Sequence, residues 1–410
     1  MLYIFRVILL GILLVAANTS YAQVDTVAAA SGRQATVDAA QRDLADVIHG
    51  LVPRLHPVNR DTLALQEGHK FVAVIPTLGY TLQTRGLVQV ATSVAFHEPQ
   101  ANMSTIVAAL SVTQNKQLLL NATSSIWGQD NGVNWVGDWR VMHYPQSTYG
   151  LGMHTSTSRA VLMDYEYLRV YQNVLRKLKT SFYVGLGYQL DYHWNIDSHT
   201  VQQEVYQISD YHHGVRGSTV SSGVSLNLLY NSRENAINPD GGTYVNLLVR
   251  PNLQVLGSNT NFQTLLLDAR HYLHLRPKSK NILALWSYNA LTLHGTPPFL
   301  DLPSTGWDTY NNLGRGFIQG RFRGKNLLYG EAEYRFGITH NRLLGGVVFT
   351  NVQTVSEPSA SAWRFDKVAP AAGLGLRLNM NKLSRTNLAV DYGFGSDGSR
   401  ALSFNVGEVF

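Results

Sequence analysis

The residues best suited to polar chemistry lie in one stretch, residues 314–336. Every second residue from Tyr329 to Arg335 is polar, and those between are glycine, alanine and tyrosine. Side chains alternate between the two faces of a strand, so Glu331, Glu333 and Arg335 would share one face. That face carries too much charge for a dry core. We therefore expect it to line a wet lumen, while the opposite, apolar face meets lipid.

A metal or catalytic site has weaker support. Four histidines and two aspartates lie in or beside one long loop: His193, His199, His212, His213, Asp197 and Asp210. Imidazole and carboxylate suit Zn²⁺, but no tight ligand spacing such as H-E-x-x-H is present, so we interpret them as solvated loop residues. The sequence has no G-x-S-x-G elbow, no evident Ser/His/Asp set and no cysteine. We predict no enzyme, no metal and no cofactor, although distant loops could still assemble a catalytic set.

The N-terminus is typical of an export signal. Arg6 precedes an apolar run, Val7–Ala17, and small residues at Ser20 and Ala22 flank an expected cut before Gln23. The run is shorter than the ~20 residues a spanning helix needs. We expect residues 1–22 to be a signal peptide. The net charge of +6 is spread along the chain, without a basic and aromatic cluster that would indicate nucleic-acid binding.

Residues 23–68 differ in character from the rest. Thr36–Leu51 has apolar residues at helical spacing, and Pro53 and Pro57 follow it. We interpret this segment as a periplasmic helical linker or a lumen plug, with a docking site for a partner as the alternative.

From residue 69 to 410 the chain alternates between amphipathic strands and turns, which predicts an all-β fold. About sixteen strands are expected, an even number suited to a closed antiparallel transmembrane barrel. Their ranges are 69–80, 86–97, 102–112, 117–127, 134–144, 159–171, 182–193, 218–230, 243–255, 262–275, 281–293, 326–337, 343–351, 371–378, 387–394 and 402–409. Short and long connections alternate, as in outer-membrane barrels with short periplasmic turns and long outer loops. We interpret Asp391–Gly398, which is rich in glycine, as a turn.

Three motifs together resemble the BamA/TamA superfamily of outer-membrane proteins, over roughly Phe71 to Phe410. The first is Gly314-Arg315-Gly316-Phe317, similar to the family's V-R-G-F, followed by the charged strand. The second is similar to D-T-R-D-N-x3-P-x2-G-x-Y, a periplasmic turn; its residues here are Asn231, Arg233, Glu234, Asn235, Pro239, Gly242 and Tyr244. Arg233 and Glu234 can pair with each other or meet lipid headgroups. The third is the terminal strand, with alternating Phe404 and Val406 and a final Phe410, which in the family is an assembly signal and closes the barrel against the first strand.

The resemblance implies that the sixth outer loop folds into the barrel and that Arg315 contacts the inner wall. The family's F-x-D-x-G aspartate is replaced by Asn351, so Glu331 or Glu333 is the better anionic partner, with Asn351 beside them. Residues 23–68 are too short for a POTRA domain, which puts a client-protein role in doubt.

The function implied is outer-membrane protein or lipid assembly, or translocation, through a weak seam between the first and last strands. The alternative is a passive channel gated by the sixth loop. Expected partners are lipopolysaccharide, phospholipid and client barrel proteins or lipoproteins, with no nucleic acid. We expect a monomer in the bacterial outer membrane.

Overall fold

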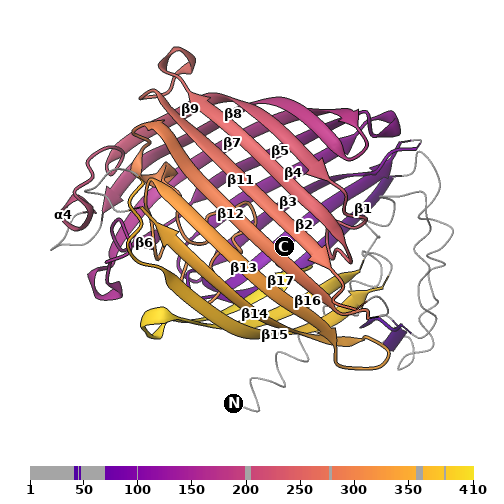
Figure 1. Ribbon diagram of the computed structural model, residues 1–410. Coiled ribbons are helices and arrows are strands. Elements are labelled where there is room, and N and C mark those ends of the chain that lie inside the picture. The colour runs from indigo at the N-terminus through magenta and orange to yellow at the C-terminus, as the bar shows by residue number, and fades with distance from the viewer. Residues whose placement is uncertain are drawn as a thin grey trace.

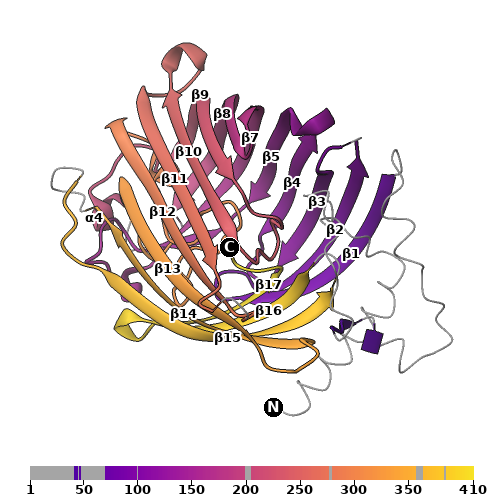
Figure 2. The same cartoon turned by 45° about the vertical axis from the view of Figure 1, so that its right-hand side comes forward.

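In the computed structural model the chain forms a nearly closed antiparallel β-barrel of sixteen strands. Figures 1 and 2 show how the strands curve around to form its wall. The structure describes residues 41–44, 46–47, 70–98, 100–198, 205–276, 279–356, 363–382 and 385–410. The predicted signal peptide and most of the predicted 23–68 segment lie outside these residues. No helix in the described ranges is long and apolar enough to cross a membrane.

Sixteen strands form the wall, and a seventeenth, β6, is a short addition inside a loop. The wall strands are β1 Lys70–Thr81, β2 Arg85–His97, β3 Met103–Thr113, β4 Leu118–Trp127, β5 Val133–His143, β7 Val161–Lys179, β8 Phe182–Ser198, β9 Gly217–Asn231, β10 Gly242–Asn252, β11 Phe262–Leu273, β12 Ile282–Gly295, β13 Asn326–Gly337, β14 Leu344–Val355, β15 Ala369–Asn381, β16 Thr386–Gly395 and β17 Arg400–Val406. β6 (Gln146–Thr148) pairs with the start of β7. Short helical elements are η1 Gln129–Asn131, η2 Thr157–Arg159, α4 Val205–Ser209, η3 Gln254–Leu256, η4 Phe299–Asp301 and η5 Ser396–Gly398.

Each wall strand pairs antiparallel with the next along the chain, from β1–β2 to β16–β17. The two end strands lie beside each other, but within the described residues no hydrogen-bonded ladder joins β1 to β17. All sixteen predicted strands have a counterpart because each carries the period-two alternation of a sheet with two different faces. The barrel prediction is confirmed.

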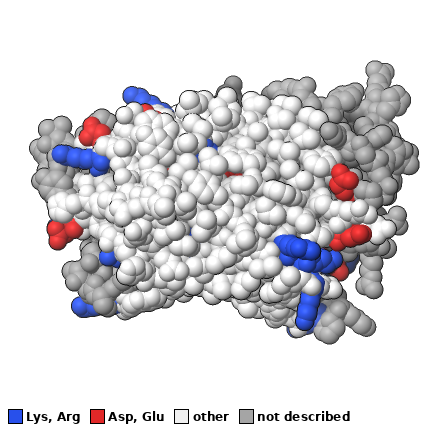
Figure 3. Space-filling model, turned by 90° about the horizontal axis from the view of Figure 1, so that it is seen from above, with Lys and Arg blue, Asp and Glu red and all other residues white. Residues whose placement is uncertain are grey.

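Alternation is clearest on β15. Its outward Leu374 and Leu376 are both 61% exposed, whereas inward Arg377 and Asn379 are buried. Large exposed apolar patches are unusual for a water-soluble protein and fit contact with lipid. Figure 3 shows the same arrangement from outside, with a broad band that is almost free of charged side chains and most of the visible charges near its two ends.

The two ends of the barrel differ. At the turn end, residues 98–102, 180–181 and 338–343 are among the short connections. At the loop end, residues 144–160, 199–216 and 296–325 are long connections, and β6, α4 and η4 lie within them. Residues of these loop-end segments pack with the adjoining ends of β5, β7 and β8 into an apolar cluster, here called the apolar dome, with Tyr144, Met163 and Phe299 among its buried residues.

The last strand is shorter than predicted. β17 ends at Val406, not at Val409, and residues 407–410 (the tail) turn into the lumen. Gly407 has φ +96°, a left-handed conformation that glycine adopts without strain and that breaks the strand. Val409 and Phe410 are therefore buried, and Phe410 does not extend a strand that pairs with β1, as the sequence led us to expect. Phe404 and Val406 remain on β17, partly or largely exposed.

Few N-terminal residues are described, and they lie at the turn end. Asp43 and Asp46 exchange hydrogen bonds, each backbone N–H donating to the other's carboxylate, as in a capping box at a helix start. Asp46 also pairs with Lys382 Nζ at 2.9 Å, and the Arg42 N–H donates to the Asn341 carbonyl. These contacts place the segment against the β13–β14 and β15–β16 turns.

Candidate functional site

The connection from residue 296 to residue 325 (the inner loop) enters the lumen, and local hydrogen bonds shape its tip. The Asp308 carboxylate accepts hydrogen bonds from the N–H groups of Tyr310, Asn312 and Leu313. Burial raises the pKa of Asp308, while those N–H groups oppose the shift. The turn so formed leads directly into Gly314.

Arg315 lies between two glycines in left-handed conformations. Gly314 has φ +84° and Gly316 has φ +102°, and the Phe317 N–H closes a tight turn onto the Gly314 carbonyl at 3.0 Å. A side chain at either glycine would be strained, which explains why both flank the arginine. The turn presents Arg315 toward β13, β14 and β16.

Arg315 meets three carboxylates. Its Nη2 donates to Glu331, and to Glu333 Oε2 at 2.5 Å; its Nη1 donates to Asp391 Oδ2 at 2.9 Å. The arginine side chain is 4% exposed and both glutamates are at 0%. A guanidinium with several charge-assisted bonds is the arrangement that makes such burial tolerable.

The predicted wall residues therefore lie together at Arg315, but Asn351 acts differently from an acid. Its Nδ2 donates to the Arg315 backbone carbonyl at 2.9 Å, holding the loop rather than the guanidinium. The guanidinium carbon also lies 3.7 Å from the centre of the Phe349 ring, a cation–π contact.

Two further arginines extend this cluster. Arg335 Nε donates to Glu333 at 2.7 Å, and Arg377 Nη1 donates to Asp391 at 2.6 Å. Gly375 leaves room for this pair, because a Cβ there would lie 1.8 Å from Asp391 Oδ1. We call Arg315, Glu331, Glu333, Arg335, Arg377 and Asp391 the arginine cluster.

β16 provides the surface on which the loop tip rests. A Cβ at Gly393 would lie 2.7 Å from the Gly316 Cα, and one at Gly395 would lie 2.6 Å from the Phe317 ring. The prediction of a turn over Asp391–Gly398 is wrong for its first half: residues up to Gly395 belong to β16, and only η5 makes the turn. The glycines serve close approach of the loop.

The tail contacts the same region from the other side. Phe410 stacks on Trp286 with ring centres 5.1 Å apart, and its carbonyl accepts a hydrogen bond from Arg335 Nη2 at 2.7 Å. Glu408 accepts from Arg377 Nε at 2.7 Å. The Val409 carbonyl accepts from Asn312 Nδ2 at 2.8 Å, so the tail and the inner loop touch directly.

A second charged cluster lies on the opposite wall. Asp191 on β8 accepts from Arg250 Nη1 at 2.5 Å and from the Tyr171 hydroxyl at 2.7 Å. Arg169 joins it at 3.4 Å. On β5, Arg140 binds Asp138 with both Nε and Nη2, and its Nη2 also donates to the Thr309 carbonyl of the inner loop at 2.9 Å.

Asp301, in η4, attaches the inner loop to this second wall. Its carboxylate accepts a hydrogen bond from the Ser221 hydroxyl and lies 3.7 Å from His193 Nδ1. Burial, with the nearby Asp191 charge, raises the pKa of Asp301 to about 7. Arg323 binds the carbonyls of Phe299 and Leu302 beside it. The loop thus spans the lumen from β13 and β16 to β5, β8 and β9.

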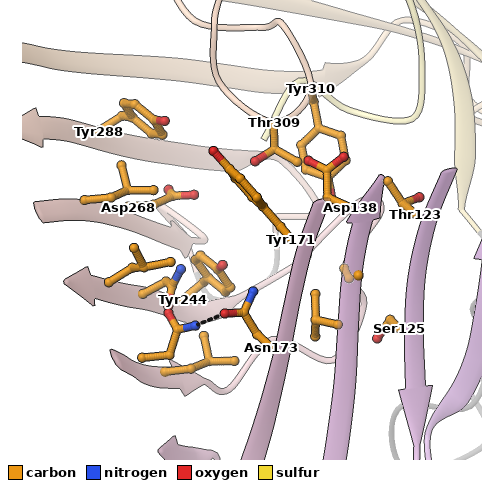
Figure 4. Close-up of a pocket in the computed structure, with 18 of the residues that line it drawn as sticks. Thr123, Ser125, Asp138, Tyr171, Asn173, Tyr244, Asp268, Tyr288, Thr309 and Tyr310 are labelled. Atoms are coloured by element: carbon orange, nitrogen blue, oxygen red, sulfur yellow. Dashed lines mark hydrogen bonds between the residues drawn. The ribbon is translucent and has the colours of Figure 1, made fainter. Parts of the chain in front are cut away.

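Below the loop lies a lumen cavity of about 1210 Å³. Its lining includes Ser181 and Arg233 at the turn end, and Asp301 and Thr309 of the inner loop at the other end. Figure 4 shows tyrosines and polar side chains, among them Tyr171 and Asp268, pointing into it. The charged residues here are mostly paired, as in Arg270 with Asp268 at 2.8 Å.

The residues of the predicted periplasmic turn make local contacts that shape the β9–β10 connection. Arg233 lies over the Tyr244 ring at 4.3 Å and donates to Asn231, rather than pairing with Glu234. The Asn235 side chain accepts from the N–H groups two and three residues later, and Gly242 has φ +94°. Pro239 is buried in the same turn.

The histidines of the β8–β9 loop do not form a common site in the described ranges. His193 is buried and stacks on Tyr167, whereas His212 is exposed and lies 3.9 Å from Asp210. No group of three metal-ligating residues occurs in the part of the chain that the structure describes. His199 is outside that part.

The sequence analysis did not identify Asp391, Arg377 or Asp301 as residues of the site, nor the second charged cluster around Asp191. Asp391 lies on the same face of β16 as Gly393 and Gly395. The alternation that indicated the inward glutamates of β13 could therefore have indicated Asp391 as well. Nothing local indicates its partner, because β16 and the inner loop are far apart in sequence.

Comparison with known proteins agrees with this architecture. Residues 101–410 match the model of the Omp85 superfamily domain, and no curated protein matches. Among solved structures, BamA from Haemophilus ducreyi lacking POTRA domains 1–3 aligns with TM-score 0.54 and 15% identity, over 81% of this chain and 69% of that chain. CdiB from Acinetobacter baumannii aligns with TM-score 0.54 and 13% identity, over 82% of this chain and 59% of that chain.

CdiB from Escherichia coli aligns with TM-score 0.54 and 11% identity, over 83% of this chain and 64% of that chain. The chain thus spans less than two thirds of either CdiB. At these identities the likeness shows a common barrel fold, and the family match covers most of the chain. The predicted resemblance is confirmed, and the chain belongs to the Omp85 superfamily of bacterial outer-membrane barrel proteins.

Proposed function

We propose that this protein assembles or translocates client polypeptides at the outer membrane through the seam between β1 and β17. The supporting observation is that these neighbours have no ladder between them within the described residues, while every other adjacent pair in the wall does. Backbone groups left unpaired in lipid cost several kcal/mol each, so such an edge favours any strand that can add to it.

The tail accounts for the weakness of the seam. β1 has 12 residues and β17 has 7, so part of the β1 edge extends beyond β17. Residues 407–410 could have lengthened β17, but Trp286, Arg335 and Asn312 hold them in the lumen. A client strand pairing with β1 would meet no competing tail. Clients of this kind are barrel proteins or lipoproteins, with outer-membrane lipids as the surroundings and a monomer as the working unit.

The passive-channel alternative has less support. The inner loop binds both walls of the lumen, and the apolar dome packs over the loop end. Ions would reach the lumen cavity from the turn end and then meet the loop. We therefore expect planar bilayers to show no steady large conductance with the wild-type protein.

The test is a reversible seam lock. The chain has no cysteine, so one introduced in β1 and one in β17 can form a single defined disulfide. Proteoliposomes with the oxidised variant should lose insertion of an unfolded client barrel protein, and a reductant should restore it. The matched control is Gln89→Cys with Ser111→Cys, a cross-strand pair on β2 and β3 that already sits in a ladder. Full activity with the seam oxidised would refute the proposal.

A further inference from the structure

The β9–β10 connection, residues 232–241 (the strap), is a structured segment at the turn end of the barrel. Ten residues separate these two strands, against two to eight in the other turn-end connections. The base of the strap is closed, because the Ser232 N–H donates to the Thr243 carbonyl at 2.9 Å and the Thr243 N–H donates to Ser232 Oγ at 2.9 Å. The Asn235 side chain accepts from the N–H groups of residues 237 and 238 and so shapes the tip.

The tip of the strap binds a distant part of the turn end. Asp240 pairs with Arg385 Nη1 at 2.5 Å, and Asn238 Nδ2 donates to the Arg385 carbonyl at 3.4 Å. Arg385 belongs to the β15–β16 turn, and four wall strands, β11 to β14, separate β10 from β15. A plain hairpin turn contacts only its own strands and their neighbours. Contacts of this reach therefore mean that the strap crosses the opening at the turn end.

The strap also contacts the tail. The Glu408 N–H donates to the Ile237 carbonyl at 3.3 Å, and a Cβ at Gly407 would lie 3.3 Å from Ile237 Cγ2. Ala236 and Ile237 of the strap line the lumen cavity, as do Gly407 and Glu408 of the tail. Strap and tail therefore lie side by side and form part of the floor of the lumen cavity.

The tip of the strap is held less firmly than its base. The Asp240 side chain is 51% exposed and that of Arg385 is 26% exposed, so their ion pair is open to solvent. Exposed ion pairs stabilise a contact only slightly and are screened by salt. The base, in contrast, continues the backbone ladder between β9 and β10. The tip can thus detach at small cost while the base stays in place.

We propose that the strap is a latch at the turn end of the lumen. Bound to Arg385 and the tail, it keeps bulky solutes such as polypeptide segments out of the lumen cavity, and once detached it admits them. Ions and small molecules pass in either state, because the strap is a single chain segment across a wide opening. This latch goes beyond the function proposed above, because it concerns access to the lumen and not the seam. The seam lock changes no residue of the strap, so the two proposals fail independently.

The experiment uses the full chain in detergent with one introduced thiol, Thr123→Cys. Thr123 lines the lumen cavity (Figure 4), and the chain has no other cysteine. Rates of thiol modification are measured with N-ethylmaleimide and with a maleimide that carries a long polyethylene glycol chain. Asp240→Arg and Arg385→Asp each place like charges at the latch, and the two together restore an opposite pair. The matched control is Asp397→Arg, which disrupts an exposed ion pair with Lys367 at the loop end.

We expect the large reagent to react roughly fivefold faster in each single reversal, because like charges repel about as strongly as the native pair attracts. The double reversal and the control should react at the wild-type rate, and N-ethylmaleimide should react equally with all variants. Equal rates of the large reagent with the wild type and the single reversals would overturn the proposal. So would a double reversal that reacts as fast as the single ones, because the two residues would then not act as a pair. A change shared by N-ethylmaleimide would also overturn it, because it would report a disturbed barrel and not a size-dependent latch.

Discussion

Replacing Arg315 with alanine should release the tip of the inner loop while the barrel still assembles. Arg315 is the cation that contacts Glu331, and its side chain is 4% exposed against 0% for the glutamate. The variant leaves Glu331 buried beside Glu333 without that cation. Breaking a buried pair by removing one partner typically costs roughly 3–5 kcal/mol, whereas an exposed pair is worth about 0–1 kcal/mol. Because Arg315 and Glu331 are both buried, we expect the larger cost, roughly 3–5 kcal/mol.

Hydrogen exchange of the loop amides measures this cost. Each 1.4 kcal/mol corresponds to about tenfold in an equilibrium constant, so a cost of roughly 3–5 kcal/mol should make the amides of residues 314–317 exchange roughly 10²- to 4 × 10³-fold faster in the variant. Protease added outside intact cells should cut the loop for the same reason. Arg315→Lys should recover little protection, because a point charge cannot bind three carboxylates as a planar guanidinium does.

Two comparisons make the result interpretable. Arg159→Ala removes the same charge from an exposed loop-end position and should leave exchange at residues 314–317 unchanged. Glu331→Gln in the Arg315→Ala background removes the unpaired carboxylate, so it should recover barrel stability but not loop protection. If Arg315→Ala exchanges like the wild type, these ion pairs do not hold the loop and the argument from burial fails.

Two further predictions concern the surfaces that the loop touches. Gly393→Val should displace the loop tip, because a Cβ at this position would lie 2.7 Å from the Gly316 Cα. Gly330→Val is the control, because a Cβ there would lie 3.9 Å from its nearest neighbour, in the Val352 side chain. Equal hydrogen exchange of the loop amides in the two variants would contradict this reasoning. At Asp301 burial raises the pKa from 3.8 to about 7, so the folded protein holds this proton more tightly than the unfolded chain. Its contribution to loop docking should weaken as pH rises from about 4 to about 7, and exchange measured at pH 5.5 and 8 should lose this dependence in Asp301→Asn.

The strands could be predicted because alternation is a local property of the sequence. β13, predicted and observed at the same residues, shows this: polar residues alternate with apolar or small ones from Tyr329 to Phe336. β7 was predicted too short because its last residues, including Lys177 and Lys179, are charged and exposed beyond the apolar band. The tail was predicted as strand because Val409 and Phe410 are apolar, and nothing local indicates that Trp286 would bury Phe410.

The candidate site was accessible from the sequence only in part. Gly314 and Gly316 indicate a presented arginine, and the alternation on β13 indicates where carboxylates face inward. Asp391 reaches Arg315 through the register of β14, β15 and β16, which no short segment determines. The Asp301 attachment is similar, since it joins η4 to residues on β8 and β9.

The contacts of the inner loop connect the arginine cluster to the seam. Asn312, three residues before Arg315, binds the Val409 carbonyl, and Arg335 of the cluster binds the Phe410 carbonyl. Loss of Arg315 should therefore weaken the Asn312 restraint indirectly, by freeing the loop tip, and disturb the Arg335 restraint through Glu333, which binds both arginines. A tail freed in this way could extend β17 along β1. Arg315→Ala should thus change protection of the β1 and β17 amides as well as the loop, and a change confined to the loop would show that the cluster and the seam act separately.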